Sequence, residues 1–138
     1  MTTAVSRSLR RPVLWGVAVG VGQAASPLAF PWLDAATVYA LGLALIATVY
    51  IGFAVADGRR TVLAVELAVA TGFVVVATAV PVLPWLVVAG LVGHGLKDMW
   101  QHRTQFVANT RWWPPFCAAV DFAAAALIAV LLAAGVTT

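Results

Sequence analysis

The chain has 138 residues, of which 63% are hydrophobic and only 9% are charged, whereas about a quarter of the residues in ordinary soluble domains are charged. Its 8 basic and 5 acidic residues are too few to cover the surface of a soluble domain of this length. The composition therefore excludes a water-soluble fold and predicts one membrane-embedded domain, residues 1–138, whose partner is the lipid bilayer. The net charge of +3 does not indicate nucleic-acid binding, because the basic residues form short clusters and no stripe.

Five apolar runs approach the roughly 20 residues that a helix needs to cross about 30 Å of hydrocarbon. They cover approximately residues 13–30, 35–56, 61–80, 82–101 and 115–136. Prolines, which lack an amide donor, mark the expected turns at Pro27, Pro31, Pro81 and Pro84. The predicted fold class is all-α, a polytopic membrane helical bundle of five transmembrane helices. The first run also has features of a secretory signal peptide, but it is long for a signal core and we expect it to be retained.

The basic residues predict the orientation of the bundle. They lie before the first run, between the second and third runs, and at or after the end of the fourth run. Since lysine and arginine collect in cytoplasmic loops, the N-terminus is predicted inside and the C-terminus outside. The tryptophans lie near the ends of the runs, as is typical of side chains at the headgroup level. These features predict a multi-pass protein of the plasma (inner) membrane.

Gly16 and Gly20 form a G-x-x-x-G pair in the first run, and Gln23 lies about 20° from the same helix face. Such small residues let two membrane helices approach closely. We expect this face to pack against another helix, although small residues are also common in membrane helices without that role. The glycine-rich faces are equally compatible with a homo-oligomer.

Ionisable side chains within the apolar runs are costly in lipid and need an explanation. Glu66, His94 and Asp121 are each predicted about 7 to 11 Å inside the cytoplasmic boundary, at a rise of about 1.5 Å per residue. On a wheel of about 100° per residue, the polar residues of the fourth run form one stripe, and Cys117 lies on the same face as Asp121. Several helices thus present polar groups that can be buried only against each other.

These residue types predict a divalent metal site, with zinc, iron or manganese as the ion. The candidate ligands are two imidazoles, two carboxylates and a thiol, namely His94, Asp98, His102, Asp121 and Cys117. The candidate catalytic residues beside them are Glu66, Lys97 and Tyr50. His94 and His102 lie about 12 Å apart along an ideal helix, so both can bind one ion only if the helix ends or bends. A site at this depth suits an enzyme whose lipophilic substrate enters from the bilayer.

Two other readings compete with the enzyme. In the first, the polar cluster is structural: Lys97 or Arg103 neutralises Asp98, and His94 pairs with Asp121 or Glu66, in a non-catalytic assembly subunit. In the second, the protein is a proton- or ion-coupled transporter. The transporter is disfavoured, because the outer halves of the last three runs offer few polar groups to continue a pathway.

The segment from His94 to His102, followed by Cys117 and Asp121, has the pattern H-G-x-x-D-x-x-x-H … C-x-x-x-D. In this it resembles small actinobacterial-type integral membrane proteins of unknown function. The resemblance covers about 30 residues, and it implies that these five side chains act as one set. It implies no reaction. The position before the aspartate, where that pattern usually has tryptophan, is occupied here by Lys97.

Overall fold

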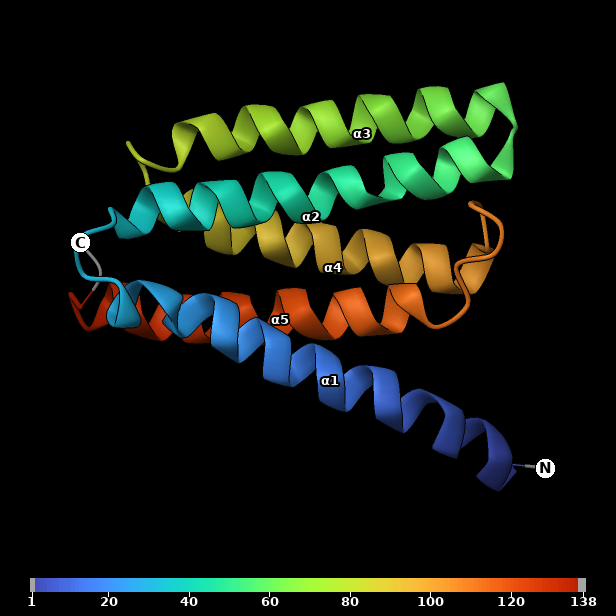
Figure 1. The fold of residues 1–138 in the computed structure, drawn as a ribbon, viewed down its shortest axis with the longest axis horizontal. Coiled ribbons are helices and arrows are strands. Elements are labelled where there is room, and N and C mark those ends of the chain that lie inside the picture. Colours follow the sequence, from blue (N-terminus) through green and yellow to red (C-terminus); the bar gives the residue numbers. More distant parts are fainter. Residues whose placement is uncertain (1, 137–138) are drawn as a thin grey trace.

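The computed structural model describes residues 2–136, and side chains from residue 9 onward; these residues form a bundle of five helices with no strand (Figure 1). The helices are α1 (Thr2–Ala29), α2 (Ala35–Asp57), α3 (Arg60–Ala79), α4 (Trp85–Thr104) and α5 (Trp113–Ala133). The described N-terminal end, the α2–α3 turn and the α4–α5 loop lie at one end of the bundle. All the segments rich in arginine therefore share that end, which we call the basic end.

Four helical segments are long and apolar enough to cross a membrane: Leu9–Ala29 of α1, and all of α2, α3 and α5. The fifth helix, α4, has a similar length but carries too many polar residues to meet that criterion. Its position explains the difference, because α4 packs against α5, α3 and α2. Its polar side chains His94, Asp98 and Gln101 are buried there, so the bundle itself shields them from lipid.

The predicted boundaries hold to within three residues except at the start of α1. This helix was expected over 13–30, yet it begins at Thr2 and continues through Pro12 and Pro27. The end of α1 at Ala29 agrees with the predicted end at residue 30, but the turn expected at Pro27 is absent for a local reason. A proline at this position removes the amide that would bond the carbonyl of Gln23. The Ser26 hydroxyl donates to that carbonyl at 2.7 Å instead, which satisfies the freed acceptor.

The residue types in the short connections explain their conformations. Gly58 ends α2 with φ +80°, and its amide donates to the carbonyl of Ala54. Because glycine adopts this left-handed conformation without a Cβ clash, the chain can reverse into α3 within two residues. Pro114 and Pro115 occupy the first turn of α5, where the missing amides would have no helical partner anyway.

The G-x-x-x-G face of α1 packs against α5, as predicted. A Cβ atom added to Gly16 would collide with the carbonyl oxygen of Phe116 and lie 2.7 Å from the Cβ of Ala119. One added to Gly20 would collide with the carbonyl oxygen of Val120. The backbones of α1 and α5 thus touch at these glycines. Beyond them, toward the N-terminus, α1 leans away from the rest of the bundle (Figure 1).

Two apolar clusters fill the interior. The larger lies toward the end opposite the basic end and includes Leu43, Val87 and Ile128; the smaller lies at the basic end and contains Tyr50, Ala54, Val62 and Val107. The buried ionisable residues lie on the stretches of helix between these two clusters.

The glycine contact predicts a position-specific effect of one added methyl group. Gly20→Ala should push α1 from α5 and lower the midpoint of unfolding in detergent. Gly22→Ala is the matched control, because a Cβ at Gly22 meets nothing within 4 Å. That control should be neutral or stabilising by about 0.5 to 1 kcal/mol, since alanine favours helix over glycine. Equal melting curves for the two variants would contradict the contact.

Candidate metal centre

Four potential metal ligands meet between α4 and α5. His94 and Asp98 lie one turn apart on α4, and Cys117 and Asp121 lie one turn apart on α5. Residues at this spacing share a helix face, and the two faces meet because the helices pack together. One ligand atom from each of the four side chains lies within 4.8 Å of those of the other three, and all four residues are buried.

The close approach of the helices depends on a glycine. A Cβ atom added to Gly95 would lie 2.9 Å from the Phe122 ring and 3.3 Å from the Cβ of Asp121. A larger residue would therefore push α5 away and separate the ligand pairs. Gly95 directly follows His94, so the close contact between α4 and α5 lies beside the candidate ligands.

Most hydrogen-bond acceptor atoms of these four side chains have no hydrogen-bond partner in the part of the chain that the structure describes. His94 Nδ1 lies 2.8 Å from Asp121 Oδ2 and 3.4 Å from Asp98 Oδ2. Asp98 is 0% exposed. Within residues 9–136, neither oxygen of Asp98, nor Oδ1 of Asp121, nor Nε2 of His94 has a hydrogen-bond partner. Buried polar atoms in proteins are nearly always bonded, so this concentration of unbonded atoms is a distinctive feature of the group.

The three predicted catalytic residues form a second polar group beside the first. Lys97 Nζ lies 2.6 Å from Glu66 Oε2 and 3.3 Å from the centroid of the Tyr50 ring. Glu66 is 1% exposed, and the Lys97 side chain is 12% exposed. The Tyr50 ring in turn lies 6.2 Å from the His94 ring. Glu66 therefore neutralises Lys97, whereas the sequence had suggested Asp98 as the partner of that lysine.

His102 is the one predicted ligand outside the group of four. It lies one turn beyond Asp98 on α4, which stays helical as far as Thr104. The bend or helix end that would bring both histidines to one ion is therefore absent from this stretch of the described chain. The role of His102 as a ligand stays a prediction that the present geometry does not support.

Phe73 belongs to the surroundings of His94 and was not predicted. Its ring meets the His94 ring edge-on, with centroids 5.1 Å apart. Its spacing from Glu66 could have identified it in the sequence. Phe73 follows Glu66 by seven residues, or two helical turns, which places both side chains on one face of α3. A second ring, that of Tyr50, also packs on the imidazole. The two rings fix the plane of the histidine.

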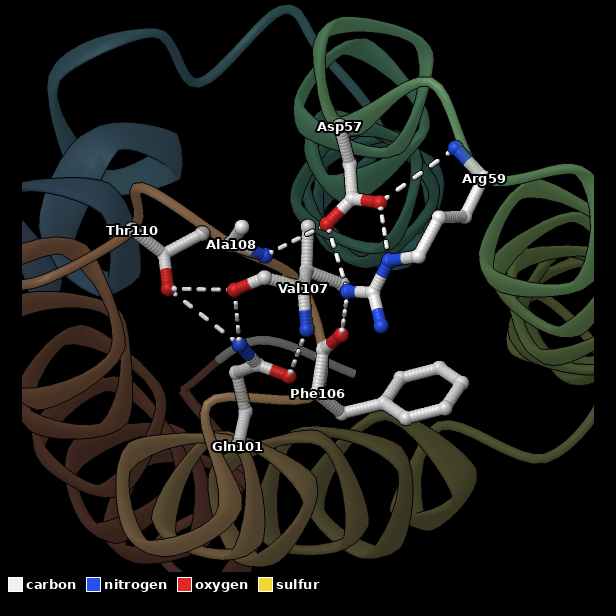
Figure 2. Close-up of polar contacts among 7 residues, drawn as sticks. All are labelled: Asp57, Arg59, Gln101, Phe106, Val107, Ala108 and Thr110. Carbon is white, nitrogen blue, oxygen red and sulfur yellow. Dashed lines mark hydrogen bonds and ion pairs between the residues drawn. The ribbon is translucent and has the colours of Figure 1, made fainter.

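A network of backbone and side-chain hydrogen bonds holds the α4–α5 loop over the basic end (Figure 2). Gln101 donates to the carbonyl of Val107 at 2.8 Å and accepts from the amide of Val107 at 3.1 Å. Gln101 also donates to Thr110 Oγ1 at 3.2 Å. Asp57 accepts from the amide of Ala108 at 2.7 Å, which ties the loop to α2.

Arg59 completes this network. Its guanidinium pairs with Asp57 at 2.6 Å and donates to the carbonyl of Phe106 at 2.7 Å (Figure 2). Hydrogen bonding to Asp57 raises the pKa of Arg59 above its ordinary value. The Val107 side chain, held in place by these bonds, is fully buried against Tyr50 and Val62. The loop therefore closes the basic end of the bundle next to the candidate site.

No protein-family model, no curated protein and no solved structure matches this chain. The chemistry of the site must therefore be argued from its own geometry.

The Glu66–Lys97 pair predicts a large effect of removing one partner. Glu66→Gln should destabilise the protein by about 3 to 5 kcal/mol, because it leaves a buried ammonium group without its counter-charge. The double variant Glu66→Gln/Lys97→Met should recover most of that loss. Reversible unfolding in mixed detergent micelles measures both. A double variant no more stable than the single one would show that the two side chains do not interact as described.

The loop network predicts a second stability effect. Gln101→Ala removes three hydrogen bonds of a fully buried side chain and leaves two Val107 backbone groups without that partner, so a loss of about 2 kcal/mol is expected. Thr104→Ala, an exposed change three residues away on the same helix, should stay within about 0.5 kcal/mol of the parent protein. Hydrogen exchange of the Val107 and Ala108 amides should rise only in the first variant.

Proposed function

We propose that this chain is a metal-dependent membrane enzyme. Its divalent ion would be bound by His94, Asp98, Cys117 and Asp121, and its substrate would be lipophilic. The observation that carries the metal site is the set of donors around the Asp98 carboxylate: it is wholly buried, its contact with His94 Nδ1 is long at 3.4 Å, and a thiol and a second carboxylate lie within reach of the same ion. Nitrogen, sulfur and oxygen donors that converge in this way form the usual ligand set of zinc.

The charges support a divalent cation. Glu66 and Lys97 neutralise each other at 2.6 Å, so they do not compensate the group of four. Asp98 and Asp121 then bring two negative charges into a dry interior, where unpaired charges are very costly. A protonated His94 compensates one of these charges and a dication compensates both, while a Cys117 thiolate bound to that ion adds one further negative charge. Among zinc, iron and manganese, the thiol of Cys117 favours zinc over manganese, because soft sulfur ligands suit zinc.

The second polar group supports catalysis. A bound divalent ion supplies a Lewis acid that polarises a carbonyl or phosphoryl oxygen. Lys97 would hold Glu66 in place through their 2.6 Å ion pair, and Oε1 of Glu66, which has no hydrogen bond within the described residues, would accept a proton. Tyr50 would position the Lys97 ammonium through its ring. The membrane in question would be the plasma membrane, with the basic end in the cytoplasm.

A structural cluster is the second candidate, and one observation favours it. The 2.8 Å contact between His94 and Asp121 is already a good charge-assisted hydrogen bond that joins α4 to α5. A transporter has less support. The core at the opposite end of the bundle contains no buried acidic, basic or histidine side chain within residues 9–136, and its one buried hydroxyl among the cluster residues, that of Tyr39, donates to the carbonyl of Ala24; a chain of ionisable groups would therefore stop at the site.

Cobalt titration tests the metal site. The purified protein in neutral detergent should bind about one Co²⁺ per chain, with the near-ultraviolet charge-transfer band of a thiolate ligand. Asp98→Asn should weaken binding by at least about tenfold, since even changes outside the ligand shell commonly cost that much. Cys117→Ser should remove the charge-transfer band while keeping the visible bands of a bound ion.

Asp34→Asn is the control, because this exposed carboxylate belongs to the N-cap of α2 at the far end of the bundle. It should bind cobalt like the parent protein. If the parent protein binds no cobalt or zinc, the metal site is wrong. Loss of folding in Asp98→Asn and Asp121→Asn together with that result would establish the structural cluster.

A further inference from the structure

A cavity of about 400 Å³ lies between α1, α4 and α5, and Asp98, whose side chain is itself fully buried, is among the residues that line it. Val13 of α1, Met99 of α4, and Ala119 and Phe122 of α5 form its apolar walls. By helix rise, the distance in depth from Arg103 near the end of α4 to Phe122 is about 12 Å. The cavity therefore runs along the bundle from the basic end past the level of the candidate metal site.

The end of this cavity near the α4–α5 loop is basic. Arg103 and His102 line it. Within residues 9–136, Arg103 forms no ion pair, and Nδ1 of His102 is buried without a hydrogen-bond partner. Nearby, Arg11 lines an adjoining hollow together with Trp15 and Trp112.

No acidic residue of this half of the bundle forms an ion pair with Arg103 within residues 9–136. Asp57 pairs with Arg59, Glu66 pairs with Lys97, and Asp98 and Asp121 face His94. Arg103 at the mouth of the cavity therefore has no carboxylate partner within residues 9–136. A positive charge at the rim of an apolar slot complements a molecule with an anionic head and a hydrocarbon chain.

We infer that this cavity binds the acyl chain of a fatty-acid-like lipid, with its carboxylate at Arg103 and His102 and its chain along Val13 and Phe122. The volume lies at the low end of the range for ligand pockets, which suits a single chain. This inference goes beyond the proposed function. With the carboxylate at the mouth, the hydrocarbon chain passes the level of Asp98 and no carbonyl oxygen reaches the metal ligands, so the lipid is a bound ligand of the cavity and not the molecule whose oxygen the ion would polarise.

Photolabelling with a diazirine-bearing palmitate and the matching palmityl alcohol tests the assignment. Both probes are applied below saturation to the full-length protein in phosphatidylcholine nanodiscs, once stripped of metal and once loaded with zinc. Palmitate should label Val13, Met99 or Phe122. Arg103→Gln should reduce that labelling about tenfold, because a charge-assisted hydrogen bond is lost, and should leave labelling by the alcohol unchanged.

Two control variants distinguish labelling in the cavity from labelling by general contact with lipid. Arg60→Gln removes another exposed basic residue of the same end, remote from the cavity, and should label like the parent protein. Val13→Phe should reduce labelling by both probes because it fills the slot, whereas Val21→Phe, at a comparably exposed position of α1, should not.

Equal labelling by the acid and the alcohol in the parent protein would overturn the inference, as would equal effects of Arg103→Gln and Arg60→Gln. Labelling outside the cavity would overturn it as well. If palmitate labels the cavity as expected but the protein binds no metal, the metal-dependent function fails while the lipid site stands. If metal binds and the cavity shows no preference for the acid, only the lipid site fails.

Discussion

The arrangement of the bundle depends on the cost of placing the carboxylates of Asp98 and Asp121 in a dry interior. Each ionised group in such surroundings needs a close counter-charge or ligand. The chain meets this need by bringing α4 and α5 into close contact at Gly95, where a side chain would collide with the Phe122 ring. That contact places His94 between the two carboxylates. The remaining unbonded oxygens are the reason to infer a cation.

The same constraint explains why α4, the helix too polar to count as a membrane span, lies in the middle. Lys97 and Asp98 are consecutive, so their side chains leave α4 about 100° apart. Lys97 pairs with Glu66 of α3, and Asp98 faces Cys117 and Asp121 of α5. A helix with charged groups on two faces can be buried only if it has a partner on each face. The apolar α1, α2, α3 and α5 then present their outer surfaces to lipid.

Much of this arrangement was predictable from the sequence, since lipid requires long apolar helices and the depth of each polar residue follows from counting. The polar stripe of α4 and the Cys117–Asp121 face were predictable from helical periodicity. The partner of each charge was not: periodicity gives a face but no rotation between helices, and so Lys97 was assigned to Asp98 instead of Glu66. The turn expected at Pro27 does not form, because the Ser26 hydroxyl bonds the carbonyl that the proline leaves free.

The closed ends of the bundle limit how any ligand can reach the site. On one side the interior is a continuous apolar cluster around Leu43, Val87 and Ile128. On the other side the loop bound by Gln101 and Asp57 buries Val107 over the polar groups. The cavity between α1, α4 and α5 is a lateral approach, and it exists because α1 touches α5 at Gly16 and Gly20 and then leans away. A molecule that uses such an approach must already be dissolved in the bilayer.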